Sequence, residues 1–361
     1  MSDKPADLQI AWAEAVLPAG NLSETLRFFI DELGFRLDSI TPADDPMLAR
    51  LSGHGLHLRL DAAHRGDPGM LHLGVGGNRQ HEAMTAPNGT RIEFGPATQS
   101  LVMPKLQPGL SIQRFDDRED TWKSGRAGMQ YRDLIPDRLG GYLIASHIRI
   151  PEGGPVADNV HYHGISFQLI YCYRGWVRLV YEDQGEPFVM RPGDCVLQPP
   201  HIRHRVLESS DGLEVIEISS PAVHMTYLDH DMHLPTGRHL PKRDYGGQSF
   251  VFHRAVEARW EDEQESRFEI RDLGIAEATK GLAGAKIIRS TAACEFAGEP
   301  VTQSKAFAFT FVLRGQLILL TGGRSETNLT AGDAFVIPAG MQQGLKGCSK
   351  DMELLEVSLP A

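Results

Sequence analysis

The chain has 361 residues, of which 41% are hydrophobic and 23% charged, so it suits two or three soluble globular domains and is not a disordered chain. No run approaches the ~18–20 apolar residues that a membrane helix needs, so we expect no membrane partner. The formal net charge of −11, without a long Lys/Arg cluster, argues against nucleic acid and favours small-molecule partners.

The first residues lack the pattern of a signal peptide, because no basic segment is followed by an apolar one. We therefore expect a cytoplasmic protein. The four cysteines, Cys172, Cys195, Cys294 and Cys348, have no CxxC spacing, which argues against a disulfide framework, a zinc ribbon or a redox pair. Buried free thiols are the expectation.

Residues 1–97 are expected to form a small α+β module with the order βαβββ. A helix begins after the N-cap residue Asn21 and ends before Gly34. Its apolar stripe consists of Leu22, Leu26, Phe29, Ile30 and Leu33. Strand-like runs precede and follow this helix, an order that indicates a compact α+β unit. The seam with the remaining chain is expected at 96–108.

An internal repeat with a period of about 140 residues indicates two similar domains after this module. The segment from Tyr131 to Pro200 and the segment from Ile270 to Gly340 carry the same motifs in the same order. Short alternating runs broken by Gly and Pro turns predict mainly β domains, either sandwiches or small barrels. We place the two copies at 98–245 and 246–361. The Gly-, Pro- and His-rich segment 229–250 is expected to be a linker with solvated histidines.

Three histidines of the first copy have the spacing of a metal site. His161 and His163 flank one residue at the head of a β-run, so alternation places both imidazoles on one face. A hairpin containing Gly193 and Pro199 then brings His204 from another strand. Three neutral imidazoles bind first-row divalent metals well. A packing role without metal is disfavoured, because burial of three convergent imidazoles is costly.

Alternation also predicts the residues of the pocket. On the strand that follows the histidine pair, Gln168, Ile170 and Cys172 fall on the metal face, with inert core filling as the alternative for Cys172. His147 and Arg149 alternate on a preceding strand and are candidates for binding a carboxylate. The second copy has an arginine at the position corresponding to Arg149, so a structural ion pair is the alternative role.

These residues resemble the cupin superfamily, whose first motif contains an HxH pair, a Glu and a Gly, and whose second contains Gly, Pro and His. The first copy matches the family spacing at His161, His163, Gly175, Gly193, Pro199 and His204. It departs from the pattern at Pro155, Gln168, His201 and Glu208, and only Gln168 replaces a metal ligand. The resemblance implies double-stranded β-helix barrels and one divalent metal held by the three histidines.

Replacement of the family's Glu by Gln168 leaves the site with one more positive charge, which favours an anionic substrate oxygen as the next ligand. Two roles stay open for Gln168: weak coordination through its amide oxygen, or a hydrogen bond to a metal-bound water or substrate, which we favour.

The second copy lacks the ligands. Val301 and Gln303 stand at the HxH positions, Ala308 at the Glu position, and Gln343 at the position of the third histidine. We expect no metal there and a role in packing and assembly.

Residues 8–94 resemble the vicinal oxygen chelate (glyoxalase-like) superfamily in the runs NLSETLRFFIDELGF and APNGTRIEF. The resemblance puts Glu14, His72 and Glu93 at ligand positions. Only about ten residues follow Val75 before the closing hairpin, too few for the helix and strands of a second half. We therefore expect a truncated structural or lid module in preference to a second metal site.

A two-barrel chain with a three-histidine centre in its first barrel resembles the gentisate and hydroxynaphthoate dioxygenases, and also the quercetinases. The resemblance implies an Fe(II) oxidoreductase that uses O₂ to cleave an anionic aromatic or enolic small molecule, with Gln168 orienting the substrate. Two alternatives stay open: a redox-inert Zn, Ni or Mn isomerase or lyase, and a non-catalytic binding protein. Barrel edges leave room for a homo-oligomer.

Overall fold

A computed structural model of the protein describes residues 9–77, 81–97, 101–115, 121–262, 267–296, 299–322 and 325–360. The chain divides into two compact units, residues 1–100 and 101–361. Both are built mainly of β-strands, as the sequence predicts. Within the described ranges, no helix is long and apolar enough to cross a membrane.

The first unit begins with the predicted order βαβββ. Its elements are β1 (Ala15–Pro18), α1 (Leu22–Arg27), the π-helix η1 (Phe28–Glu32), β2 (Arg36–Thr41), β3 (Leu48–Gly53), β4 (Leu56–Asp61), β5 (Met70–Val75), β6 (Met84–Thr85) and β7 (Arg91–Pro96). The Asn21 side chain caps α1 by accepting a hydrogen bond from the Glu24 backbone N–H at 3.2 Å. The predicted helix is therefore present, but its second part is a π-helix.

Two sheets form this unit. The strands β1 to β4 make a sheet in the order β1-β4-β3-β2, with β1 parallel to β4. In the second sheet, of order β5-β7-β6, β5 is likewise parallel to β7. The described part of the unit beyond β4 thus holds three strands.

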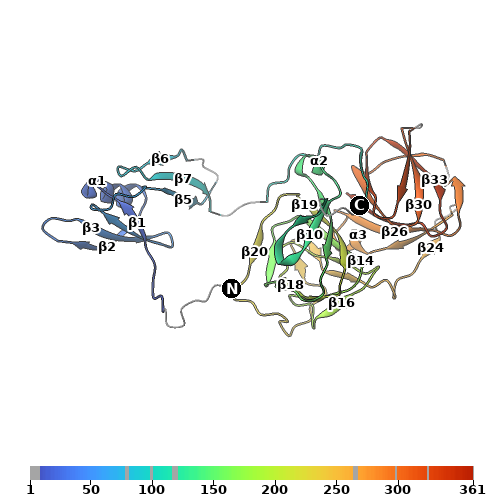
Figure 1. Ribbon diagram of the computed structural model, residues 1–361, viewed down its shortest axis with the longest axis horizontal. Coiled ribbons are helices and arrows are strands. Elements are labelled where there is room, and N and C mark those ends of the chain that lie inside the picture. The colour runs from blue at the N-terminus through green and yellow to red at the C-terminus, as the bar shows by residue number, and fades with distance from the viewer. Residues whose placement is uncertain are drawn as a thin grey trace. The chain divides into compact units, whose positions relative to one another are not determined.

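The second unit contains two β-barrels, which lie side by side (Figure 1). The first barrel and the segment after it contain β9 (Lys123–Ser124), the 3₁₀-helix η3 (Arg126–Gly128), β10 (Gln130–Asp133), α2 (Arg138–Gly141), β11 (Ile144–Ile150), β12 (Gly154–Pro155), β13 (His161–His163), β14 (Phe167–Arg174), β15 (Val177–Tyr181), β16 (Phe188–Met190), β17 (Cys195–Leu197), β18 (His204–Ser209), β19 (Leu213–Ser220), β20 (Thr226–Leu228), β21 (Asp244–Tyr245), β22 (Gln248–Ser249) and β23 (Val251–His253).

The second barrel follows the same plan. It contains β24 (Glu261–Asp262), β25 (Phe268–Asp272), α3 (Ile275–Ala278), β26 (Gly284–Ser290), β27 (Cys294–Phe296), β28 (Val301–Thr302), β29 (Phe307–Arg314), β30 (Gln316–Thr321), β31 (Ser325–Thr330), β32 (Ala334–Pro338), β33 (Gln342–Cys348) and β34 (Glu353–Leu359). The pairing order β17-β14-β19-β11 of the first barrel recurs as β32-β29-β34-β26 in the second. This recurrence accounts for the internal repeat of the sequence.

The two barrels exchange edge strands. β8 (Ser111–Gln113), which precedes the first barrel in the chain, pairs with β32 of the second. β23, which follows the first barrel, pairs back onto β17 of the first. Each exchanged strand covers a sheet edge that would otherwise present unpaired backbone groups. A boundary at residue 245, as expected from the repeat, therefore leaves each barrel with a strand from the other copy.

The predicted linker 229–250 is held against the first barrel by ion pairs. The buried carboxylate of Asp183 pairs with Arg238 at 2.7 Å and with Arg243, and it accepts a hydrogen bond from Thr236 at 2.8 Å. The three histidines of the segment are exposed, as predicted: His230, His233 and His239.

One apolar core joins the large sheets of both barrels. Its buried side chains include Phe167, Leu169, Tyr171, Ile216 and Ile218 of the first barrel and Phe307, Phe309, Phe311, Leu355 and Val357 of the second. The aromatic rings of Phe311 and Tyr173 meet edge to face across this interface, with centroids 5.2 Å apart. Burial of this surface stabilises the pair of barrels as a unit.

Substitution Phe311→Ala should lower the free energy of unfolding by about 3–5 kcal/mol, because it leaves a cavity at the junction. Urea unfolding measures this loss. Val256→Ala serves as the control, since Val256 is 83% exposed and its truncation should change stability by less than about 0.5 kcal/mol. Equal effects of the two substitutions would contradict a stabilising core between the barrels.

Candidate metal centre

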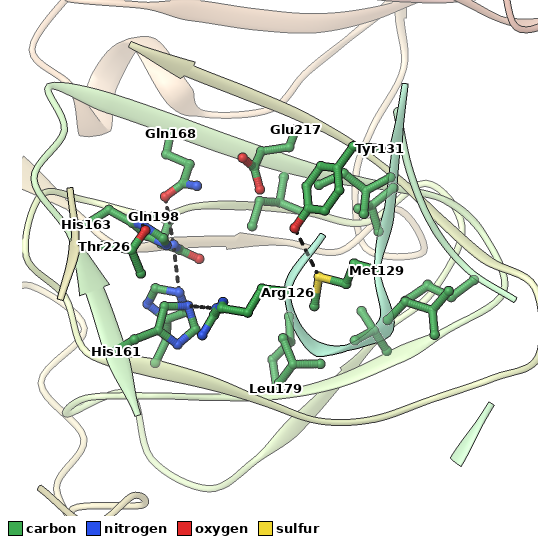
Figure 2. Close-up of a pocket in the computed structure, with 18 of the residues that line it drawn as sticks. Arg126, Met129, Tyr131, His161, His163, Gln168, Leu179, Gln198, Glu217 and Thr226 are labelled. Carbon is green, nitrogen blue, oxygen red and sulfur yellow. Dashed lines mark hydrogen bonds between the residues drawn. The ribbon is translucent and has the colours of Figure 1, made fainter. Parts of the chain in front are cut away.

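The three predicted ligands meet inside the first barrel. β13 supplies His161 and His163, whose rings lie close together in Figure 2. His204 opens β18 and stands directly opposite His161 in the antiparallel register. Ligand atoms of the three imidazoles all lie within 4.8 Å of one another. In the described residues, no other group of three His, Cys, Asp or Glu side chains converges in this way.

Contacts on the outer face hold β13 in place. Tyr162, between the two histidines, stacks on Tyr227 of β20 with ring centroids 5.0 Å apart. The Arg203 guanidinium lies over the Tyr162 ring at 4.1 Å. Because alternate side chains point to opposite faces, anchoring Tyr162 outside directs both imidazoles inward.

The outer nitrogen of each imidazole has a hydrogen-bond partner. The partners of the three Nδ1 atoms are the Asn159 and Ile202 carbonyl oxygens and the Thr226 hydroxyl, at 2.8, 3.0 and 2.9 Å. A carbonyl oxygen only accepts, so the Nδ1 atoms of His161 and His204 carry the hydrogen and their Nε2 atoms keep a lone pair. Metal-binding histidines are oriented in this manner. The donor set therefore fits a divalent metal.

Burial keeps the triad uncharged. The pKa of His163 is lowered to about 2, chiefly by loss of hydration and to a smaller extent by the charges of His161 and His224. Burial also lowers the pKa of His204 well below the ordinary value and lowers that of His161, against the opposing charge of Asp158. Neutral imidazoles bind metals, whereas imidazolium does not.

Two protein groups donate to the inward nitrogens. Arg126 Nη2 lies 2.8 Å from His161 Nε2, and Gln198 Nε2 lies 3.0 Å from His204 Nε2. Arg126 is also held by the buried Asp158 carboxylate through an ion pair of 2.8 Å. These donors mark the lone pairs that a metal ion would use.

Gln168 has hydrogen bonds at both ends of its amide. Its oxygen accepts from Gln198 Nε2 at 2.8 Å, and its amide group forms a side-chain hydrogen bond with Glu217. The oxygen of Gln198 in turn accepts from the Tyr181 hydroxyl at 2.8 Å. The result is a polar network, with the Glu217 carboxylate as its terminal acceptor.

A cavity of about 350 Å³ lies beside the triad. Its wall is largely apolar and includes Ile148, Ile170, Leu179 and Val215. The polar side chains that reach it besides the triad and the two glutamines include Arg126, Tyr131, Glu217, His224 and Thr226. This volume and lining are typical of a site for a small molecule.

Comparison with known proteins gives the family of this region. Residues 146–219, which include the HxH pair and His204, match the family described as the cupin domain. The first barrel is a cupin domain. No curated protein matches the chain.

Solved structures share the two-barrel cupin fold. Salicylate 1,2-dioxygenase from Pseudaminobacter salicylatoxidans superposes with a TM-score of 0.52 at 16% identity, over 72% of this chain and 86% of that chain. The putative glyoxylate induced protein from Pseudomonas aeruginosa gives 0.50 at 14%, over 74% and 94%. Oxalate decarboxylase from Bacillus subtilis gives 0.50 at 13%, over 73% and 80%. At these identities the likeness shows the fold alone.

Of the predicted pocket residues, Gln168 and Ile170 line the cavity, but Cys172 does not. Cys172 faces the barrel interior, as alternation predicts, yet it is fully buried in the apolar core beyond the cavity. Burial raises the pKa of its thiol to about 12. The side chain is therefore core filling, the alternative considered for this residue.

His147 and Arg149 do not line the cavity, which corrects the sequence prediction. Their neighbours Ile148 and Ile150 face it, so His147 and Arg149 point to the opposite side of β11. There the His147 ring meets a phenylalanine of the second barrel, and its Nε2 lies 2.7 Å from the Glu214 carboxylate. Alternation separates the two faces of a strand but does not tell which face is inside.

Sequence reasoning missed several polar residues of the site, among them Arg126, Gln198 and Glu217. Glu217 sits in the run LEVIEI at the same parity as the buried Val215, and a charged residue on a buried face is a usable signal. Gln198 directly precedes the motif proline. Arg126 lies in the short η3 helix outside any motif, so only the tertiary structure reveals it.

The second cupin barrel keeps the register of the site without its ligands. Val301 pairs with Gln343 as His161 pairs with His204. Ile337 stands where the first barrel has Gln198, and it belongs to an apolar core that fills this barrel. A smaller cavity of about 250 Å³ remains, with Lys286, Lys305 and Glu356 in its lining.

The N-terminal unit does not bring its three candidate ligands together as a metal-binding group among the described residues. Glu14 is paired with Arg50 at 3.0 Å and with Arg59 at 3.3 Å, and Glu93 is paired with Arg91 at 2.7 Å. His72 is the strand neighbour of Glu93. The comparisons do not confirm the glyoxalase-like resemblance, which stays a prediction.

The uncharged triad predicts that the metal-free protein loses stability in acid. Below about pH 6.5 the unfolded chain protonates these histidines while the folded chain does not, so the unfolded state binds more protons. The free energy of unfolding should then fall between pH 7 and 5, by up to about 1.4 kcal/mol per pH unit for each histidine. Urea unfolding at several pH values gives the slope.

His163→Gln should reduce this slope by the contribution of one histidine, up to about 1.4 kcal/mol per pH unit. The matched control is His230→Gln, because His230 is exposed, and it should leave the slope unchanged. A steep slope that survives in His163→Gln would mean that other groups cause the acid sensitivity.

Proposed function

We propose that this protein is a cupin dioxygenase that uses one Fe(II), held by His161, His163 and His204, to cleave an anionic aromatic or enolic small molecule. The donor set carries the proposal: three neutral imidazoles, two of them buried and that of His163 partly buried, converge without a carboxylate among them. Such a set leaves the full charge of the ion for an anionic ligand. When bound, the iron supplies activation of O₂ and a Lewis acid for substrate oxygens.

Arg126 supports an anionic substrate. Its guanidinium reaches the cavity next to His161, and the ion pair with Asp158 fixes its position. A guanidinium has five N–H donors, so Arg126 can keep Asp158 and also donate to a substrate carboxylate. The apolar wall takes the carbon skeleton and excludes bulk water from the reaction.

The likeness in fold to a salicylate 1,2-dioxygenase supports an oxygen-dependent reaction on a hydroxylated aromatic acid. The likeness to oxalate decarboxylase, whose structure is described with Mn(II) centres, is the observation that favours a metal-dependent lyase as the second candidate. Metal identity and O₂ consumption separate the two candidates.

Protein purified without oxygen should contain about one iron per chain, and His204→Ala should contain none, because two imidazoles hold the ion too weakly. Elemental analysis measures both, with His239→Ala as a control at an exposed histidine. Zinc or manganese alone, or metal retained in His204→Ala, would contradict the assignment of iron to the triad. Oxygen uptake with hydroxylated aromatic acids then tests the dioxygenase reaction.

Arg126→Met should raise KM for an anionic substrate about 10- to 100-fold, as expected for loss of a charge-assisted hydrogen bond of about 1.5–3 kcal/mol. Steady-state oxygen uptake measures KM. The KM for the neutral amide of the same substrate should change little in Arg126→Met. The control Arg178→Met removes one partner of a half-exposed surface ion pair and should leave KM as in the unmodified protein. Equal losses for acid and amide would contradict a role in charge recognition.

A further inference from the structure

A carboxylate faces the cavity from β19, the strand paired with β14. The Glu position of the cupin motif holds Gln168 on β14, while Glu217 lies on β19, the strand paired with β14. In this register Glu217 stands opposite Ile170, on the same face as Gln168 and diagonal to it. Figure 2 shows the Glu217 carboxylate between Gln168 and Tyr131.

The carboxylate of Glu217 has polar neighbours but no ion pair in the part of the chain that the structure describes. It is hydrogen-bonded to the Gln168 amide, and its Oε1 accepts from the Ser219 hydroxyl at 3.3 Å. Arg126 and His224 act on it through charge alone. By contrast, the buried carboxylates of Asp158 and Asp183 have arginine partners.

An unpaired carboxylate in a largely apolar cavity is costly to keep charged. Burial raises the pKa of Glu217, although the charge of His224, the hydrogen bonds from Gln168 and Ser219, and the charge of Arg126 all lower it. The Glu217 charge also raises the pKa of Tyr131, after burial as the larger cause. A group that the fold keeps at such a cost, in a cavity beside a metal centre, is a candidate for proton transfer.

We propose that Glu217 is the catalytic base that accepts the proton of a substrate hydroxyl, so that the substrate carries a hydroxyl beside its carboxylate. This inference rests on the proposed function. The O–H bond of the enol or phenol breaks, a new O–H bond forms on Glu217, and the substrate oxygen keeps the electron pair. The resulting oxyanion is the form that a divalent metal held by the triad would favour as a ligand.

Two groups on the cavity wall then divide the recognition of the substrate. Arg126, next to His161, takes the carboxylate, and Glu217 takes the hydroxyl hydrogen. Gln168 is a positioning residue, because its amide joins Glu217 to Gln198. The lost motif carboxylate is thus replaced by one that contacts the substrate instead of the metal.

Anaerobic calorimetry on the iron-loaded protein tests this, with 2-hydroxybenzoate and benzoate as probes that differ by one hydroxyl. The unmodified protein should bind 2-hydroxybenzoate at least tenfold more tightly than benzoate. Repeating the titration in buffers of different ionisation enthalpy counts released protons, and fewer than half a proton should reach the buffer, since Glu217 retains it. The tenfold difference in affinity corresponds to one charge-assisted hydrogen bond.

Glu217→Gln, which has the same shape, should reduce the preference for the hydroxylated probe to about threefold or less. Glu217→Asp keeps the carboxylate and should recover part of the preference for the hydroxylated probe. The control Glu208→Gln removes a half-exposed carboxylate on β18 and should change neither the preference for the hydroxylated probe nor the number of released protons.

Two results would overturn the role of Glu217: iron-loaded protein without a preference for the hydroxylated probe, and a preference that persists in Glu217→Gln. Failure of the chain to hold iron at the triad would instead contradict the proposed function. The metal content of each sample is measured in parallel, so the two failures are distinguishable.

Discussion

The pairing of β13 with β18 sets His161 directly opposite His204, and the remainder of the candidate site depends on this register. Strand side chains alternate between faces, so a slip of one residue would turn His161 and His163 out of the barrel. The stacked Tyr162 and Tyr227 rings on the outer face hold the strand against such a slip. With the register held, two short strands bring three imidazoles to one point.

Burial at this point determines the chemistry. The imidazoles lose their water, which keeps them neutral, and their outer nitrogens are occupied by carbonyl and hydroxyl groups. The motif carboxylate is missing from β14, and Glu217 faces the same cavity from the neighbouring strand β19. The site therefore has a guanidinium and a carboxyl group on its walls, Arg126 and Glu217, and an uncharged donor set for the metal.

The two barrels share one plan but have different interiors. In the first, polar side chains line a cavity beside the triad, whereas in the second the apolar Ile337 stands at the position of Gln198 and a smaller cavity remains. The barrels are joined by a common apolar core and by the exchanged strands β8 and β23. A duplicated domain has thus kept its packing in both copies and its ligand constellation in one.

Much of this protein follows from sequence alone, because strand alternation and turn residues are local properties. The repeat, the mainly β barrels, the βαβββ order and the convergence of the HxH pair with His204 all rest on spacing along short segments. The inward face of β11 was not predictable, since His147 and Ile148 alternate equally well in either orientation. Only packing against the second barrel decides it. Arg126, Gln198 and Glu217 likewise acquire their roles from segments distant in the chain, because hydrogen bonds and burial depend on tertiary contacts that no local pattern encodes.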